Sequence, residues 1–230
     1  MPPDHDKPGA PAPKASHLRD AVYGGIDGAV TTFAIVAGVA GAGLPTGIIL
    51  ALGLANVAAD GFSMAAGNYS GTKADRDDRH RLRADLHTRI QREPAAMRDA
   101  LREVFRAKGM SGAGLGAAVD AISADREMWV AMMLAEEHGL GSTEPRPLVA
   151  ASVTFAAFLG AGIVPLIPFV LSLPAPLPVS AGLTMATFAA IGAIKSRWSL
   201  TAWWKSAAET LLIGGTAAII AYSVGTLFDF

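Results

Sequence analysis

The chain has 230 residues, of which 51% are hydrophobic and 17% are charged, and its formal net charge is −1. Soluble domains usually carry about 25% charged residues, so the deficit indicates a membrane protein. The absence of cysteine excludes disulfide frameworks, thiolate nucleophiles and cysteine-ligated metal.

The N-terminal segment is rich in proline and alanine and lacks the apolar core of a cleavable signal peptide. We predict that residues 1–17 form a disordered tail. After it come five apolar stretches, each long enough for a membrane helix, which needs about 20 mostly apolar residues. In chain order these stretches are Ala21–Leu44, Thr46–Tyr69, Leu148–Leu173, Leu177–Ile194 and Thr201–Phe228. The turns GAGLPTG and LPAPLP leave almost no room for loops, so they predict tight antiparallel hairpins.

The positions of lysine and arginine predict how the spans are oriented. The basic residues form three groups: Lys7, Lys14 and Arg19; those from Lys73 to Arg146; and Lys195, Arg197 and Lys205. All three groups fall on one side of a five-span topology, and the two short turns contain none. The positive-inside rule therefore predicts a cytoplasmic N-terminus and a C-terminus outside.

The segment between the second and third spans reads as three helices, and the first continues straight out of the second span. Pro94 suits the first position of a helix, and Gly109 and Gly139 suit helix C-termini. Residues 115–139 read as one third helix. One face of the middle helix is apolar, with Met97, Leu101, Val104 and Phe105. We predict an all-α membrane protein divided at residues 18–71, 72–146 and 147–230, with 72–146 a cytoplasmic three-helix insert.

Two carboxylates lie inside the first two spans. If the hairpin turns near Leu44, Asp27 lies about 17 residues before the turn and Asp60 about 16 after it. At about 1.5 Å per residue both acids are at nearly the same depth. Asn56, Asp60 and Met64 follow one another at intervals of four and form one stripe on the second helix. This spacing permits a site with two carboxylates, an amide and a thioether.

These acids have a plainer alternative explanation as capping or packing residues near an interface. A charge at the centre of a membrane helix costs about 2.5–3.5 kcal/mol, and both acids lie roughly 10–15 Å from the cytoplasmic end, too deep for a short side chain to reach water. Neither span contains a basic residue. A divalent cation fits better, and the thioether of Met64, unless it only packs, favours softer transition metals over magnesium or calcium.

Two further features of the spans concern packing. Glycines allow helices to approach closely, and we expect this role for Gly24, Gly28, Gly38, Gly41, Gly61 and Gly67. Glu209 lies inside the fifth span, where it either lines the same cavity or pairs with Lys205, four residues earlier. We expect the pair.

Several motifs resemble the vacuolar iron transporter family: DGAVTTFAIVAGVAGA, ANVAADGFSMAAGNYSGTKADRD, MLAEEHGL and GAIKSRWS followed by SAAETLLIGGTAAIIAYSVG. The similarity covers nearly the whole chain after residue 17, in order and spacing. It implies a five-span homodimer that moves ferrous iron, and often manganese, out of the cytosol in exchange for protons. It also implies a path at the dimer interface lined by the first helices, with Asp27 and Met64 at metal-carrying positions.

This resemblance implies a metal-binding insert as well, but the chain departs from the pattern there. At the family's glutamate positions on the first two insert helices it has Leu86, Arg89, Met97 and Ala100. The closing motif MMLAEEHGL keeps Met133 and Glu137, and Glu136 lies beside them. Other candidates, displaced from the pattern, are Asp85, His87, Glu93, Asp99 and Glu103. The insert either gathers metal or is a bundle retained for dimerisation or gating. Asn56 is a further departure, because the eukaryotic pattern has a glutamate there.

The expected function is export of Fe²⁺ or Mn²⁺ from the cytosol by proton exchange, in a bacterial inner membrane. The metal ligands would be Asp27, Asp60, Met64 and Asn56, and in the insert Met133, Glu136 and Glu137. We expect no enzymatic activity, no resident cofactor and no nucleic-acid partner. The alternative is a membrane protein that sequesters or senses metal without transporting it. An intramembrane aspartyl protease also needs two level aspartates, but its GxGD motif is replaced here by AADGFS.

Overall fold

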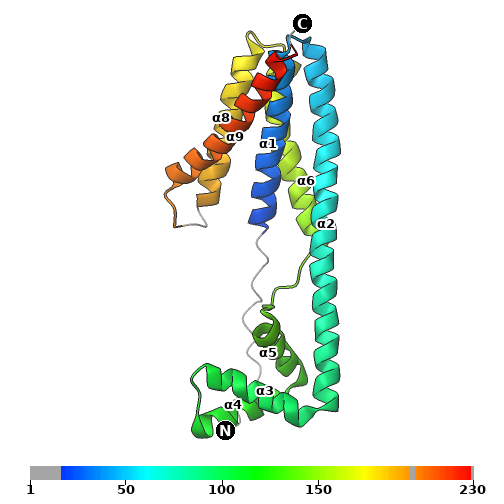
Figure 1. Cartoon of the computed structure of the whole chain (residues 1–230), viewed down its shortest axis with the longest axis vertical. Coiled ribbons are helices and arrows are strands. Elements are labelled where there is room, and N and C mark those ends of the chain that lie inside the picture. The colour runs from blue at the N-terminus through cyan, green and yellow to red at the C-terminus, as the bar shows by residue number, and fades with distance from the viewer. Residues whose placement is uncertain (1–16, 197–199, 229–230) are drawn as a thin grey trace. The chain divides into compact units, whose positions relative to one another are not determined.

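The structure is a computed structural model that describes residues 17–196 and 200–228 (Figure 1). In this described part every regular element is a helix. The elements are α1 (Leu18–Gly41), α2 (Thr46–Arg92), α3 (Pro94–Ala107), α4 (Gly112–Ala124), α5 (Arg126–His138), α6 (Pro147–Ile163), η1 (Val164–Leu166), α7 (Ile167–Val170), α8 (Pro176–Ser196) and α9 (Trp203–Thr226). They fold into two compact units, which we call the insert unit (Thr72–Arg146) and the span unit (the described residues up to Gly71 and from Pro147 onward).

Five helical segments are long and apolar enough to cross a membrane: Leu18–Gly41, Thr46–Arg92, Pro147–Val170, Pro176–Ser196 and Trp203–Thr226. The five predicted spans are confirmed in number and order. The third differs in detail, because the short 3₁₀ turn η1 interrupts it at Pro165, whose ring nitrogen has no hydrogen to donate. The predicted tail, apart from His17, lies outside the described residues, and so does Arg197.

Helix α1 packs against α6, α8 and α9 (Figure 1). At Gly24 and Gly28 a Cβ would lie only 2.4 Å from a backbone carbonyl oxygen of α6. Near the other end of α1, a Cβ on Gly225 of α9 would lie 2.2 Å from the carbonyl oxygen of Gly38. The expected role of glycine is thus confirmed at these crossings. At Gly67 no described atom lies within 4 Å of a Cβ, so within the single chain no helix approaches closely there.

The membrane portion of α2 also meets α6. A Cβ on Gly61 would touch Phe155, Phe158 and Leu159, and one on Gly53 would touch Leu166. The apolar side chains between α1, α2 and the third span form one core: Phe33, Val36, Ala37, Val39, Ile49, Val57, Leu166 and Phe169. These apolar contacts hold one face of α2 against the bundle, so the face that carries Asn56, Asp60 and Met64 is not needed for this packing.

Glu209 does not have the predicted partner. Its Oε2 lies 3.2 Å from Nζ of Lys195 on α8, while the Lys205 ammonium lies 5.4 Å from the ring centre of Trp204. The expected pair with Lys205 is wrong because α8 packs against α9 and supplies a different ammonium, while the aromatic ring attracts Lys205.

The insert unit contains the second part of α2 with α3, α4 and α5. Pro94 begins α3 as predicted, and Gly109 and Gly139 adopt left-handed conformations, with φ of 89° and 68°, just beyond helix ends. The predicted third helix is in fact two. The side chain of Asp125 accepts hydrogen bonds from the backbone N–H groups of Glu127 and Met128 and so starts α5 as an N-cap.

The contact of α1 with α6 predicts a sharp difference between two glycines. We expect Gly28→Ala to lower the free energy of unfolding by about 1–3 kcal/mol, because the new methyl group would overpack against backbone atoms of α6 that cannot move aside. Gly160→Ala is the control, because a Cβ there meets nothing within 4 Å among described atoms. The thermal unfolding midpoint in detergent measures both, and equal midpoints for the two variants would contradict this packing.

Candidate metal site within the spans

Two hydrogen bonds fix how α1 and α2 face each other. The two helices are antiparallel and joined by a short turn (Figure 1). Asn56 Nδ2 donates to Thr31 Oγ1 at 3.3 Å, and twelve residues further along α2, Asn68 Nδ2 donates to Asp20 Oδ1 at 2.9 Å. These bonds set the register of the polar faces of the two helices.

Between the two hydrogen bonds, this register brings the predicted acids to one level. Asp27 lies four residues before Thr31 on α1, and Asp60 lies four residues after Asn56 on α2. Because the helices are antiparallel, both acids lie about one turn from the Asn56–Thr31 bond, on the side of the Asn68–Asp20 bond. Two carboxylates at one level of neighbouring helices repel each other when both are charged. The next turn places Met64 at the level of Tyr23. The sequence prediction of equal depth for Asp27 and Asp60 agrees with this arrangement.

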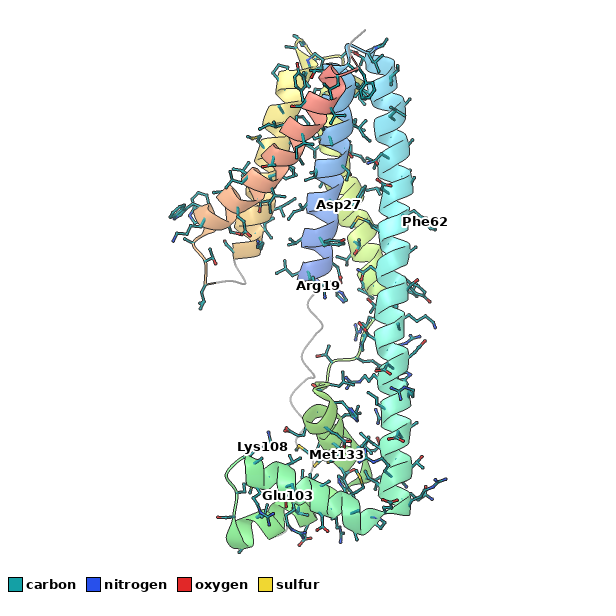
Figure 2. All side chains as sticks on the ribbon, in the orientation of Figure 1. Arg19, Asp27, Phe62, Glu103, Lys108 and Met133 are labelled. Carbon is teal, nitrogen blue, oxygen red and sulfur yellow. The ribbon has the colours of Figure 1, made fainter. Side chains whose placement is uncertain are left out.

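The site faces the outside of the single chain. Asp27 is half-buried and Asp60 is exposed, while Asn56 and Met64 are half-buried. Asp27, labelled in Figure 2, lines a groove of about 390 Å³ between α1 and α9, with Tyr23 and Ile213 among the other lining residues. An exposed carboxylate in a membrane span costs about 2.5–3.5 kcal/mol if it faces lipid. These side chains therefore need a partner other than lipid.

A second polar cluster joins three helices near the start of α1. Asn68 donates to Asp20 and also to Thr154 Oγ1 of α6 at 2.7 Å, and His17 Nδ1 lies 3.0 Å from Asp20 Oδ2. We did not single out these residues from the sequence. A signal was available, because Asn68 extends the stripe of Asn56, Asp60 and Met64 by one more turn.

The described residues contain no group of three or more His, Cys, Asp or Glu side chains placed to hold a metal ion. One chain thus offers two carboxylates, one amide and one thioether at adjacent levels of α1 and α2. Carboxylate oxygen suits manganese and magnesium alike, while a thioether selects for softer metals. The donor set therefore suits a transition-metal ion better than magnesium.

The three predicted ligands of the insert unit are engaged elsewhere. Glu137 Oε1 accepts a hydrogen bond from Arg89 Nη1 at 2.7 Å, and Glu136 pairs with Lys108 at 2.9 Å. The hydrogen bond that Arg89 donates to Glu137 raises the pKa of Arg89 further above its ordinary value, so the guanidinium stays charged. Met133, on α5 in Figure 2, is 2% exposed and belongs to the apolar core. The structure does not bring these three together as an open ligand set.

Most of the displaced candidates in the insert unit also have partners of opposite charge. Asp99 pairs with Arg102 and Glu103 with Arg106, each within one turn of α3. Asp85 lies 4.0 Å from Arg89. Of the four departures from the expected glutamate pattern, Leu86 and Met97 are core residues. The charged side chains of this unit are thus largely neutralised by one another.

Five apolar helices with acids at one level of the first two define a multi-pass helical membrane protein with a polar site inside its spans. The chain belongs to the VIT family, whose family model matches residues 18–226. It is 30% identical over 210 residues to vacuolar iron transporter 2 of Oryza sativa subsp. japonica, covering 90% of this chain and 85% of that protein.

Two other relatives match over similar lengths. The vacuolar iron transporter of Toxoplasma gondii is 31% identical over 227 residues, covering 94% of this chain and 75% of that protein. Vacuolar iron transporter 1 of Arabidopsis thaliana is 29% identical over 208 residues, covering 89% and 83%. The resemblance found in the sequence motifs is therefore confirmed as family membership.

The ion pairs of Glu136 and Glu137 predict that these two glutamates do not hold metal. We expect the double variant Glu136→Gln/Glu137→Gln to bind as many Mn²⁺ ions per chain as the wild type, because Lys108 and Arg89 already occupy both carboxylates. Equilibrium dialysis of the full-length protein in detergent measures this number. Loss of a bound ion in the double variant would show that metal displaces the two basic side chains.

Proposed function

We propose that this protein is a transporter that exports Fe²⁺ or Mn²⁺ from the cytosol in exchange for protons. The observation that carries the proposal is that Asp27 and Asp60 share one level of α1 and α2, in a stretch from Asp20 to Gly71 that contains no lysine or arginine. The relatives named vacuolar iron transporters support a metal cargo. Met64, one turn away, supports a transition metal.

The exchange follows from charge. Two carboxylates carry two negative charges, and one divalent cation or two protons cancel them. A site that lies in lipid cannot remain doubly charged and empty at low cost. The same groups therefore bind metal and protons alternately: metal enters as protons leave, and protons returning from the other side release the metal.

We further propose that two copies of the chain assemble around this site. Asp60 is exposed, and Asp27 lines an open groove. A second copy placed against the polar faces of α1 and α2 would exclude lipid from both acids. Two chains would also double the ligand set, giving four carboxylates around one path. The alternative, a protein that stores or senses metal in the insert unit, is disfavoured because the glutamates there are ion-paired.

In this proposal the basic side of the spans is cytoplasmic, so the insert unit lies in the cytosol and the C-terminus outside, in a bacterial inner membrane. The described basic residues of the span unit support this orientation, because Arg19, Lys195 and Lys205 lie at or near helix ends on one side of the five-span order. The ion-paired helices of the insert unit suit a structural or gating role.

The first test removes the charge of each intramembrane acid. We expect Asp27→Asn and Asp60→Asn to reduce Mn²⁺ flux into proteoliposomes to the level of protein-free vesicles, because a neutral side chain cannot compensate the cation. Glu209→Gln is the matched control, since that exposed carboxylate pairs with Lys195 and should transport at close to the wild-type rate. Flux that survives in Asp27→Asn would refute the proposal.

The second test concerns protons. With Mn²⁺ outside, vesicles that are acidic inside should take up metal faster than vesicles without a pH gradient, because protons leaving the lumen drive metal in. An internal pH dye should report alkalinisation in step with uptake. Flux that does not depend on the gradient would leave metal transport standing but rule out proton exchange.

A further inference from the structure

A hydrogen-bond chain ties the amide of Asn56 to the backbone beside Asp27. Thr31 Oγ1 donates to the carbonyl oxygen of Asp27 at 2.8 Å, and Asn56 Nδ2 donates to the same Oγ1 at 3.3 Å. Thr31 and Asn56 are half-buried. The chain thus runs from the second helix through one hydroxyl to the residue that carries the first acid.

The donor and acceptor in each of these two hydrogen bonds follow from the number of protons and lone pairs on the Thr31 hydroxyl. A threonine hydroxyl has one proton and two lone pairs. Because that proton goes to the carbonyl of Asp27, Thr31 can only accept from Asn56. The amide atom that faces Thr31 must therefore be the nitrogen, and the oxygen Oδ1 is turned away from it. An amide is otherwise free to point either atom at a neighbour.

We propose that Thr31 is a positioning residue for the metal site, which orients Asn56 so that Oδ1, and not the NH₂ group, serves the cation. This inference rests on the proposed transport function. Asn56 lies one turn from Asp60 on α2, as Thr31 lies one turn from Asp27 on α1. An amide oxygen adds a neutral ligand to the two carboxylates, so the charge of the site still matches that of one divalent cation.

The same two hydrogen bonds explain why an amide, and not a carboxylate, suits position 56 opposite Thr31. A carboxylate at position 56 has only acceptor atoms at neutral pH. It would face the lone pairs of Thr31 and would have to take the proton that now bonds to the carbonyl of Asp27. It would also add a third negative charge. Thr31 therefore favours an amide at this position.

The neighbouring residue Thr32 provides a control. Its hydroxyl is fully buried and has no hydrogen-bond partner among the described residues. Thr32 Oγ1 lies 3.2 Å from the position that a Cβ on Gly162 of α6 would take. Thr32 therefore faces α6, and not the stripe of Asn56, Asp60 and Met64 on α2. Thr32→Val therefore removes a threonine hydroxyl from the same helix at the same depth without touching Asn56.

The test compares Mn²⁺ uptake by proteoliposomes containing Thr31→Val, Thr31→Ser, Asn56→Ala, Thr31→Val/Asn56→Ala and Thr32→Val. We expect Thr31→Val and Asn56→Ala each to raise KM by roughly 3- to 10-fold, the range expected for one lost hydrogen bond, with the maximal rate nearly unchanged. Thr31→Ser should restore the wild-type KM, and Thr32→Val should keep it. The double variant should be no worse than Asn56→Ala alone, because in this proposal Thr31 acts on the cation only through Asn56.

Two results would overturn the inference. Additive effects in the double variant would show that Thr31 acts through α1 alone and not through Asn56. A fall in maximal rate and in thermal unfolding midpoint, with KM unchanged, would show a purely structural role. Either result is separable from failure of the transport proposal, because Asp27→Asn would still abolish flux in the same assay.

Discussion

The constraint on which the structure depends is that two carboxylates share one level inside lipid-spanning helices without any basic residue to neutralise them. From Asp20 to Gly71 the chain contains no lysine or arginine, and two like charges at one level repel each other. The cost must be offset by something from outside the chain: a metal ion, protons, or a second copy that excludes lipid. The proposed exchange uses all three.

The glycines of α1 make this arrangement possible by separating two faces of one helix. Gly24 and Gly28 lie on a row that packs directly onto the backbone of α6, and the adjacent row, Tyr23, Asp27 and Thr31, is left for polar partners. Because the close approach uses main-chain atoms, α1 is held firmly without side chains from its polar row. The hydrogen bonds of Asn56 and Asn68 then fix α2 to α1 at two levels.

The length and composition of the apolar stretches were sufficient to predict the five spans. The equal depth of the two acids was predictable as well, because depth along a helix depends only on the rise per residue and the position of the turn. These features did not predict which side chains meet across helices. Glu209 was assigned to Lys205 by its spacing along one helix, whereas packing brings Lys195 to it. The break at Asp125 was missed for a similar reason, since an N-cap competes with an otherwise continuous helical pattern. Thr31 carried no signal, because threonine in an apolar helix usually only bonds its own backbone.

The acids of the insert unit differ from those of the spans in whether basic side chains lie beside them. Glu136 and Glu137 stand where the sequence suggests ligands, yet Lys108 and Arg89 lie within 2.9 and 2.7 Å of them. Arg89 occupies a position where the resemblance implies a glutamate, so a guanidinium paired with Glu137 stands where a carboxylate is expected. In the spans no such replacement exists. Between Asp20 and Gly71 the chain has no basic side chain to offer Asp27 and Asp60, and this difference supports the proposal that a mobile cation binds within the spans.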